Sequence, residues 1–266
     1  GKMPDGSYVI ASESCALTAV DAEFVRDILP GEIVTITENG IKSDSRLIEE
    51  SKAAHIPHAH CIFEYIYFAR LDSTMDNVNI YDARIRAGKA LAASYPVEAD
   101  LVTGVPDSGL AAAMGYAQAC GLPFALAFHK NSYVGRTFIK PTQKERESAV
   151  HLKLSVLSSV VKGKRLVLID DSIVRGTTMA SLIRMLKDAG ATEVHVRISS
   201  PPFLFPCYYG TDVPSNDQLI ASSHTAAEIC ASIGADSLGY MKLEDLKQMT
   251  GDLPLCKACF DSHYPV

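Results

Sequence analysis

The sequence predicts an α/β fold in which a parallel twisted sheet is flanked by helices. Short apolar runs such as residues 166–169 have the length of buried strands and are too short for buried helices. Helical spacing follows this run from Thr178 onward and stops at Gly190. Strands and helices alternate between residues 61 and 200, which is typical of a parallel sheet with right-handed crossovers.

Composition places the chain among globular proteins. Its 266 residues suffice for one large domain, or for one domain and part of another. The formal charge of −6 argues against a nucleic-acid partner. No apolar run approaches the roughly 18 residues that span a membrane, and no signal peptide is visible. We therefore predict a cytoplasmic protein that contacts neither membrane nor nucleic acid.

The first 50 residues predict a β-rich region with one helix. Residues 8–11 favour a strand, and Asp21 can begin a helix that runs to Ile28. Residues 32–37 alternate before a turn at 38–40, which predicts a hairpin. This region is too small to bury its own core, and the chain lacks an initiator Met, so we expect it to be the end of a larger domain.

The following segments predict the elements of the sheet in chain order. Aromatic and β-branched residues predict a strand over 61–70. Further strands are expected at 99–105, 123–128 and 193–198. Helices are expected at 81–95, from Gly109 to Cys120, and at 217–222, 225–233 and 243–249.

Two strand–turn–helix junctions are candidate anion sites. After residues 166–169 come Asp170 and Asp171, then a turn and a helix that opens on Thr177 and Thr178. Backbone N–H groups and the positive end of a helix dipole favour an anion there, while the carboxylates suit hydroxyls or a metal. A solvated turn or a helix cap is the alternative. The second junction is Pro106-Asp107-Ser108-Gly109, which by itself is a weak signal.

A polar, basic stretch over residues 129–150 predicts a lid. It carries Lys130, Arg136 and Lys140, and it lacks a clear apolar period. Closure of such a lid over two phosphate sites would neutralise charge and exclude water. A solvated surface loop is the alternative.

The seven cysteines are too sparse for a disulfide scaffold, so metal ligands or free thiols are favoured. Cys256 and Cys259 form a C-x-x-C pair, which fits a redox-active pair, half of a zinc site or a chance spacing. A tetrahedral cluster or zinc site needs four thiolates. Cys15, Cys120 and Cys230 have helical or apolar neighbours and are interpreted as core residues. The best remaining partners are Cys61 and Cys207, and either zinc or an iron–sulfur cluster would fit the four.

The stretch Arg165–Thr178 resembles the phosphoribosyl-diphosphate (PRPP) binding signature of type I phosphoribosyltransferases, in the form found in amidophosphoribosyltransferases. Residues 11–17 and 30–33 look like the closing segments of that family's N-terminal-nucleophile glutaminase domain. The family's nucleophilic N-terminal cysteine has no match, since the chain begins with Gly1. The resemblance implies a glutaminase remnant at 1–55, a type I phosphoribosyltransferase domain at 56–235 and a C-terminal tail at 236–266.

The resemblance implies a pentosyltransferase of purine biosynthesis. Ammonia would displace pyrophosphate at C1 of PRPP and give 5-phosphoribosylamine; glutamine supplies the ammonia in intact relatives, and ammonia alone is expected to serve here. Asp170 and Asp171 would hold the ribose hydroxyls and, with Ser108, place Mg²⁺. The expected phosphate contacts are Ser172, Ile173, Val174, Arg175, Gly176, Thr177 and Thr178 for the 5′-phosphate, and Asp107, Ser108, Gly109, Lys130, Arg136 and Lys140 for pyrophosphate and the lid.

One branch of this family carries a 4Fe–4S cluster, and the resemblance implies Cys61, Cys207, Cys256 and Cys259 as its ligands. It also implies feedback inhibition by purine nucleotides and a homo-oligomer, either dimer or tetramer. Two alternatives are another type I phosphoribosyltransferase, which uses a base as nucleophile, and a non-catalytic PRPP-sensing module.

Overall fold

The computed structural model describes residues 1–56, 58–133, 153–213 and 215–265. Its packing divides the chain into two compact units. We call them the terminal unit (Gly1–Ala83, Thr250–Ala258, His263–Val266) and the sheet unit (Arg84–Met249, Cys259–Ser262). The domain bounds expected at residues 55 and 235 stay a prediction. Within the described ranges, no helix is long and apolar enough to cross a membrane.

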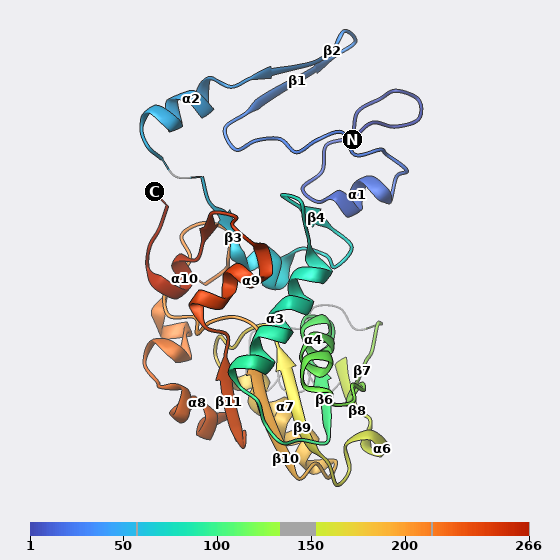
Figure 1. Ribbon diagram of the computed structural model, residues 1–266, viewed down its shortest axis with the longest axis vertical. Coiled ribbons are helices and arrows are strands. Elements are labelled where there is room, and N and C mark those ends of the chain that lie inside the picture. Colours follow the sequence, from blue (N-terminus) through green and yellow to red (C-terminus); the bar gives the residue numbers. More distant parts are fainter. Residues whose placement is uncertain (57, 134–152, 214, 266) are drawn as a thin grey trace. The chain divides into compact units, whose positions relative to one another are not determined.

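The sheet unit contains the predicted parallel sheet (Figure 1). Its strand order is β11-β10-β9-β6, and every neighbouring pair is parallel. The strands are β6 (Leu101–Gly104), β9 (Arg165–Asp170), β10 (Glu193–Ile198) and β11 (Ser237–Tyr240). The first three agree with the expected strands, whereas β11 was not expected.

Helices cover both faces of this sheet (Figure 1). On one face lie α4 (Leu110–Cys120) and the part of α3 (Ile80–Ser94) that belongs to the unit. These two helices approach closely, since a Cβ on Gly115 would lie 2.0 Å from the carbonyl oxygen of Ile85. On the other face, α7 (Thr177–Asp188) and α8 (Ala226–Ile233) bury Leu182 and Ile229 against Leu168 and Val196.

Short elements complete the sheet unit, and one of them corrects an expectation. The strand expected at 123–128 is reduced to a single bridge between Val102 and Phe124, and a strand begins only at Phe128. The remaining elements are β7 (Phe128–Lys130), β8 (Leu154–Val156), α6 (Ser158–Val161), η2 (Asn216–Gln218), η3 (Ile220–Ser222) and η4 (Leu243–Asp245). Among the described elements, three helices have residues in both units: α3, α9 (Leu246–Thr250) and α10 (Ala258–Asp261).

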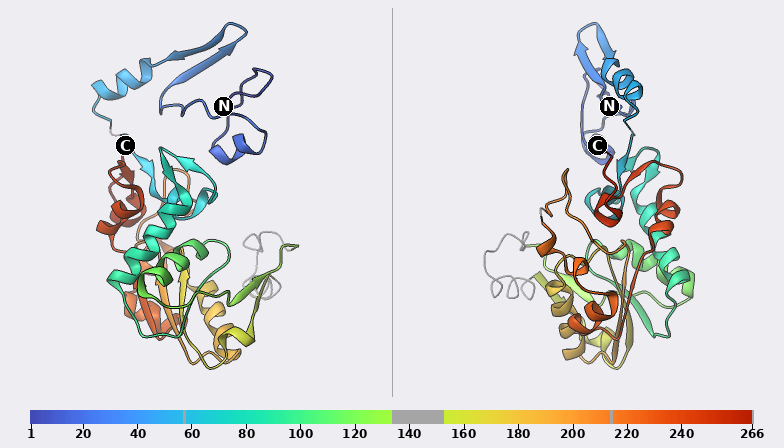
Figure 2. Two further views of the ribbon diagram at one scale, coloured as in Figure 1. Left: turned by 45° about the vertical axis from the view of Figure 1, so that its right-hand side comes forward. Right: turned by 90° about the vertical axis from the view of Figure 1, so that its left-hand side faces the viewer.

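The terminal unit contains the expected hairpin, drawn in blue in Figure 2. The strands of this hairpin are β1 (Ile33–Thr37) and β2 (Gly40–Asp44). Two other expectations are wrong: Tyr8 forms only a bridge, and the helix lies at α1 (Ser14–Thr18) instead of 21–28. Asp21 has a φ of 55°, which is incompatible with a right-handed helix. The other elements are α2 (Arg46–Ala53), β3 (His60–Cys61), β4 (Thr74–Met75), β5 (Val78–Asn79) and β12 (Leu255–Cys256).

The strand expected over residues 61–70 is also wrong. Only Cys61 belongs to a strand, and a π-helical turn, η1 (Glu64–Phe68), follows it. Ile62, Tyr65 and Ile66 are all buried. Their spacing of three and four residues places them on one side of a helix, so burial overrides the β-propensity of these aromatic and branched residues.

Candidate active site

The two candidate anion turns lie next to each other because their strands are neighbours. β6 and β9 are parallel, and Gly104 is the register partner of Ile169. Both turns therefore leave the carboxyl edge of the sheet, where open α/β sheets bind their ligands. The two turns are therefore neighbours, and the ligand contacts predicted for them stay predictions.

Glycines let the turn after β6 fold directly onto β9. The N–H of Val105 donates to the carbonyl of Ile169 at 2.9 Å, and the N–H of Gly109 donates to Val105 at 2.9 Å. A Cβ on Gly109 would lie 2.2 Å from the Ile169 oxygen, and one on Gly104 would lie 2.6 Å from the Gly109 oxygen. Only glycine fits this close approach. The peptide bond between Pro106 and Asp107 is cis.

Two buried carboxylates stand where β9 ends. Asp170 and Asp171 are 8% and 7% exposed. Ser108 Oγ donates to Asp170 Oδ1 at 3.1 Å, which joins the two turns, and the Asp171 N–H donates to the same oxygen at 2.9 Å. Ser172 Oγ donates to Asp171. Burial, together with the charge of Asp171, raises the pKa of Asp170 well above its ordinary value, and burial also raises the pKa of Asp171.

The turn after these acids presents backbone donors. Gly176 has a φ of 80°, a left-handed conformation that glycine adopts readily, and it leads into α7 at Thr177. Among the described residues, the backbone N–H groups of residues 173–178 have no hydrogen-bond partner. These donors, together with the positive end of the α7 dipole, form a seat for an anion.

The side chain of Arg175 points to a partner that the sequence did not indicate. Its guanidinium donates to Gln218 Oε1, and the N–H of Ile220 donates to the carbonyl of Val174 at 2.9 Å. The η2–η3 segment therefore packs against the turn at residues 172–176. Arg175 is thus engaged by a neighbouring side chain, while the predicted backbone contacts of this turn stay available.

Of the lid predicted over residues 129–150, the beginning up to residue 133 lies within the described residues. Lys130, the last residue of β7, forms an ion pair with Asp107 in the turn after β6. Arg136 and Lys140 lie outside the described residues, so their predicted roles stay predictions.

The cysteine prediction has one direct structural counterpart. Cys61 and Cys256, both in the terminal unit, are register partners in the parallel β3–β12 pair. Burial raises the pKa of the Cys61 thiol, and the nearby Cys256 adds to this. In the described parts of the chain, no group of three or more His, Cys, Asp or Glu side chains is placed to hold a metal ion.

The other two predicted ligands lie in the sheet unit. The N–H groups of Tyr209 and Thr211 each donate to Cys207 Sγ at 3.4 Å. Burial opposes the thiolate, but these hydrogen bonds prevail and lower the pKa of Cys207. The carbonyl of Cys259 accepts from the N–H groups of Leu204 and Phe205 at 2.9 and 3.1 Å. The interpretation of Cys120 as a core residue is wrong, because its side chain is exposed at the end of α4.

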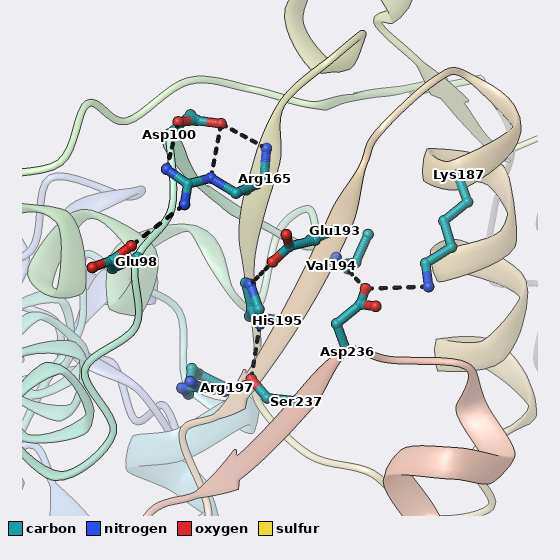
Figure 3. A network of polar contacts seen from close by, with 10 residues as sticks. All are labelled: Glu98, Asp100, Arg165, Lys187, Glu193, Val194, His195, Arg197, Asp236 and Ser237. Carbon is teal, nitrogen blue, oxygen red and sulfur yellow. Dashed lines mark hydrogen bonds and ion pairs between the residues drawn. The ribbon is translucent and has the colours of Figure 1, made fainter.

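The opposite edge of the sheet is fixed by ion pairs (Figure 3). Arg165 pairs with Asp100 at 3.0 Å where β9 begins. Asp236 pairs with Lys187 at 3.1 Å and accepts the Val194 N–H at 2.7 Å. His195 lies between Glu193 and Ser237, at 2.9 and 3.0 Å. These contacts stabilise the amino ends of the strands. Asp170, Asp171 and the N–H groups of residues 173–178 lie at the other edge, where the strands end.

Comparisons with known proteins agree with this arrangement. The family model of the phosphoribosyl transferase domain matches residues 74–199, which include both anion turns. The chain is 50% identical to the amidophosphoribosyltransferase of Archaeoglobus fulgidus over 100% of its own length and 58% of that protein. It is 49% identical to the amidophosphoribosyltransferase of Bacillus subtilis, over 100% of this chain and 56% of that protein.

Solved structures give the same result. The chain is similar to the B. subtilis glutamine PRPP amidotransferase complexed with ADP and GMP, with a TM-score of 0.84 and 48% identity. That match covers 96% of this chain and 56% of the other. The sheet unit therefore has a type I phosphoribosyltransferase fold, and the chain spans a little more than half the length of the curated relatives it matches.

Proposed function

Because this chain belongs to the amidophosphoribosyltransferase family, we propose that it transfers the phosphoribosyl group of PRPP to ammonia. The products are 5-phosphoribosylamine and pyrophosphate, as in the first committed step of purine biosynthesis, and the chemistry is that of a pentosyltransferase. Ammonia comes from a glutaminase domain when glutamine is the donor. Free ammonia suffices for the half-reaction that the described residues carry out.

One observation carries this proposal: the Ser108–Asp170 hydrogen bond joins two anion turns at one edge of the sheet. A sugar with phosphate at one end and pyrophosphate at the other matches two such turns separated by a pair of carboxylates. The turn from Ser172 to Thr178 binds the 5′-phosphate through backbone N–H groups that have no hydrogen-bond partner in the described parts of the chain. The turn at 107–109 binds pyrophosphate, and Asp170 and Asp171 accept from the ribose hydroxyls.

The residues at this edge also fit the chemistry of C1. As pyrophosphate leaves, C1 gains positive charge, so the enzyme acts mainly by positioning and by electrostatic stabilisation. Asp170 and Asp171 hold the ribose ring and place negative charge beside it. Lys130 and the backbone N–H groups of the turn at 107–109 stabilise the negative charge of the leaving pyrophosphate. Burial of both acids reduces screening by water, which strengthens these interactions.

Asp170, Asp171 and Ser108 fit a magnesium ion. Oxygen ligands suit this hard cation, and a divalent charge offsets the mutual repulsion of two buried acids. Bound Mg²⁺ would neutralise pyrophosphate and make it a better leaving group. We place Mg²⁺ at these three residues.

The cysteine ligands of a 4Fe–4S cluster are proposed as Cys61, Cys207, Cys256 and Cys259. Within the terminal unit, the register of Cys61 and Cys256 supports the proposal. Within the sheet unit, the N–H groups aimed at Cys207 would stabilise a metal-bound thiolate. The cluster would have a structural role, and zinc is the alternative occupant.

Regulation, assembly and location follow from the same family relation. Purine nucleotides would inhibit by occupying the PRPP site; the similar B. subtilis structure is described as a complex with ADP and GMP. We also propose a homo-oligomer, either dimer or tetramer, in the cytoplasm.

Pyrophosphate release from PRPP with ammonia as the nucleophile tests the activity. Turnover with a purine or pyrimidine base instead of ammonia would identify another phosphoribosyltransferase, and binding without turnover would identify a sensor.

A further inference from the structure

An ion pair joins Lys130 at the end of β7 to Asp107 in the turn after β6. The exposed fraction of the lysine side chain is 34%, and that of the aspartate is 65%. The two residues are 23 positions apart and come from different elements. The contact therefore fixes the position of an ammonium group beside the turn that is proposed to bind pyrophosphate.

The backbone of the same turn offers donors without partners. Among the described residues, the N–H groups of Asp107 and Ser108 make no hydrogen bond. An anion that accepts from these groups would lie next to the Asp107 side chain. An unpaired carboxylate at this place would repel a pyrophosphate of the same sign.

The ammonium of Lys130 removes this conflict. It has three N–H donors, so contact with one carboxylate oxygen leaves two for phosphate oxygens. A lysine stem has many rotamers, and binding must remove that freedom unless a neighbour has already restricted it. Asp107 supplies this restriction before the ligand arrives, while its own charge is neutralised.

We propose that the side chain of Asp107 has a positioning role: it holds Lys130 at the pyrophosphate turn and acts on the ligand only through that lysine. The inference rests on the proposed function, since it needs pyrophosphate to bind at this turn. It differs from a direct role of the Asp107 side chain as a pyrophosphate ligand. It also differs from a competing role, in which Asp107 withholds the lysine from the ligand.

These roles differ in whether Asp107→Asn strengthens or weakens pyrophosphate binding, measured once with Lys130 present and once with Lys130→Gln. We would titrate magnesium pyrophosphate into the wild-type chain, Asp107→Asn, Lys130→Gln and the double variant. With Lys130 present, Asp107→Asn should weaken binding about two- to fivefold, the range that an exposed ion pair supports. With Lys130→Gln, the same change should strengthen binding, because only the repulsion between Asp107 and the anion is left to remove.

A second readout separates positioning from a loss of fold. Asp107→Asn should raise KM for PRPP by a similar factor while kcat stays within about twofold, and Asp107→Glu should restore most of the loss. Glu98→Gln is the matched control, since it removes one negative charge before β6, at the opposite edge of the sheet. It should bind magnesium pyrophosphate as the wild type does.

Two results would overturn the inference. Stronger binding on Asp107→Asn in both backgrounds would show competition or simple repulsion, and weaker binding in both would show a direct ligand role. If the folded wild-type chain failed to bind magnesium pyrophosphate at all, the proposed function would fail and this inference with it. If the chain binds magnesium pyrophosphate but Asp107→Asn changes the affinity in a direction other than the expected one, the inference is contradicted and the proposed function is not.

Discussion

Cys61 and Cys256 are direct register partners in a parallel pair of two-residue strands, although they are far apart in the sequence. Such a short pair has few backbone hydrogen bonds and gains little stability by itself. A metal centre that uses both sulfurs would add the missing stabilisation. The proposed 4Fe–4S cluster would therefore stabilise this strand pair.

The cluster proposal predicts the effect of one cysteine substitution. Cys256→Ser should abolish visible absorbance and remove iron and sulfide from protein purified without oxygen, because one of four ligands is lost. Cys120→Ser is the matched control, since Cys120 is exposed and lies in another element. A colourless wild-type protein that contains zinc would contradict the proposal.

The two buried acids that are proposed to bind PRPP should lower the stability of the ligand-free protein. Asp170→Asn should raise the melting temperature of the ligand-free protein, because it removes like-charge repulsion between two buried carboxylates. The same variant should lose turnover. Asp188→Asn, an exposed acid at the end of α7, should change neither property. A lower melting temperature for Asp170→Asn would count against this account.

The same pair predicts the direction of a pH effect. Both acids have a raised pKa in the folded chain, so the folded state holds more protons than the unfolded state above about pH 4. Stability should therefore fall as pH rises from there through the raised pKa values. Thermal melts of the ligand-free wild type should show this slope, and Asp170→Asn should flatten it. An equal slope in both proteins would rule out this pair as the cause.

The close contact between Gly109 and Ile169 predicts a steric effect. Gly109→Ala places a methyl group 2.2 Å from a backbone oxygen that cannot move away easily. We expect a loss of about 1–3 kcal/mol in the free energy of unfolding, together with weaker pyrophosphate binding. A Cβ on Gly210 would meet no atom of the described residues within 4 Å, so Gly210→Ala should stay within about 0.5 kcal/mol of the wild type in urea unfolding. Equal stabilities would refute the packing argument.

Local sequence signals were sufficient for the centre of the fold. The run before Asp170 and the spacing after Thr178 predict β9 and α7, because each pattern depends only on residues inside its own element. The parallel sheet was also predicted, and parallel strands share their carboxyl edge, but the position of β6 next to β9 was not indicated by the sequence.

The remaining features depend on partners distant in sequence. Residues 61–70 carry β-propensity, but burial of Tyr65 and Ile66 makes the segment helical. β12 exists only because it pairs with β3, and a two-residue strand has no periodicity to detect. Neither the Lys130–Asp107 pair nor the Arg175–Gln218 contact has a local signal, because each joins two separate turns or strands.

Ammonia-dependent turnover of PRPP tests the central claim most directly. Purified wild-type chain with Mg²⁺ and an ammonium salt at about pH 8 should release pyrophosphate and form 5-phosphoribosylamine. The Asp170→Asn, Asp171→Asn double variant should stay folded and lose about 10²-fold or more in kcat. If folded wild-type chain binds PRPP but releases no pyrophosphate with ammonia, or if the double variant retains full activity, the account is contradicted.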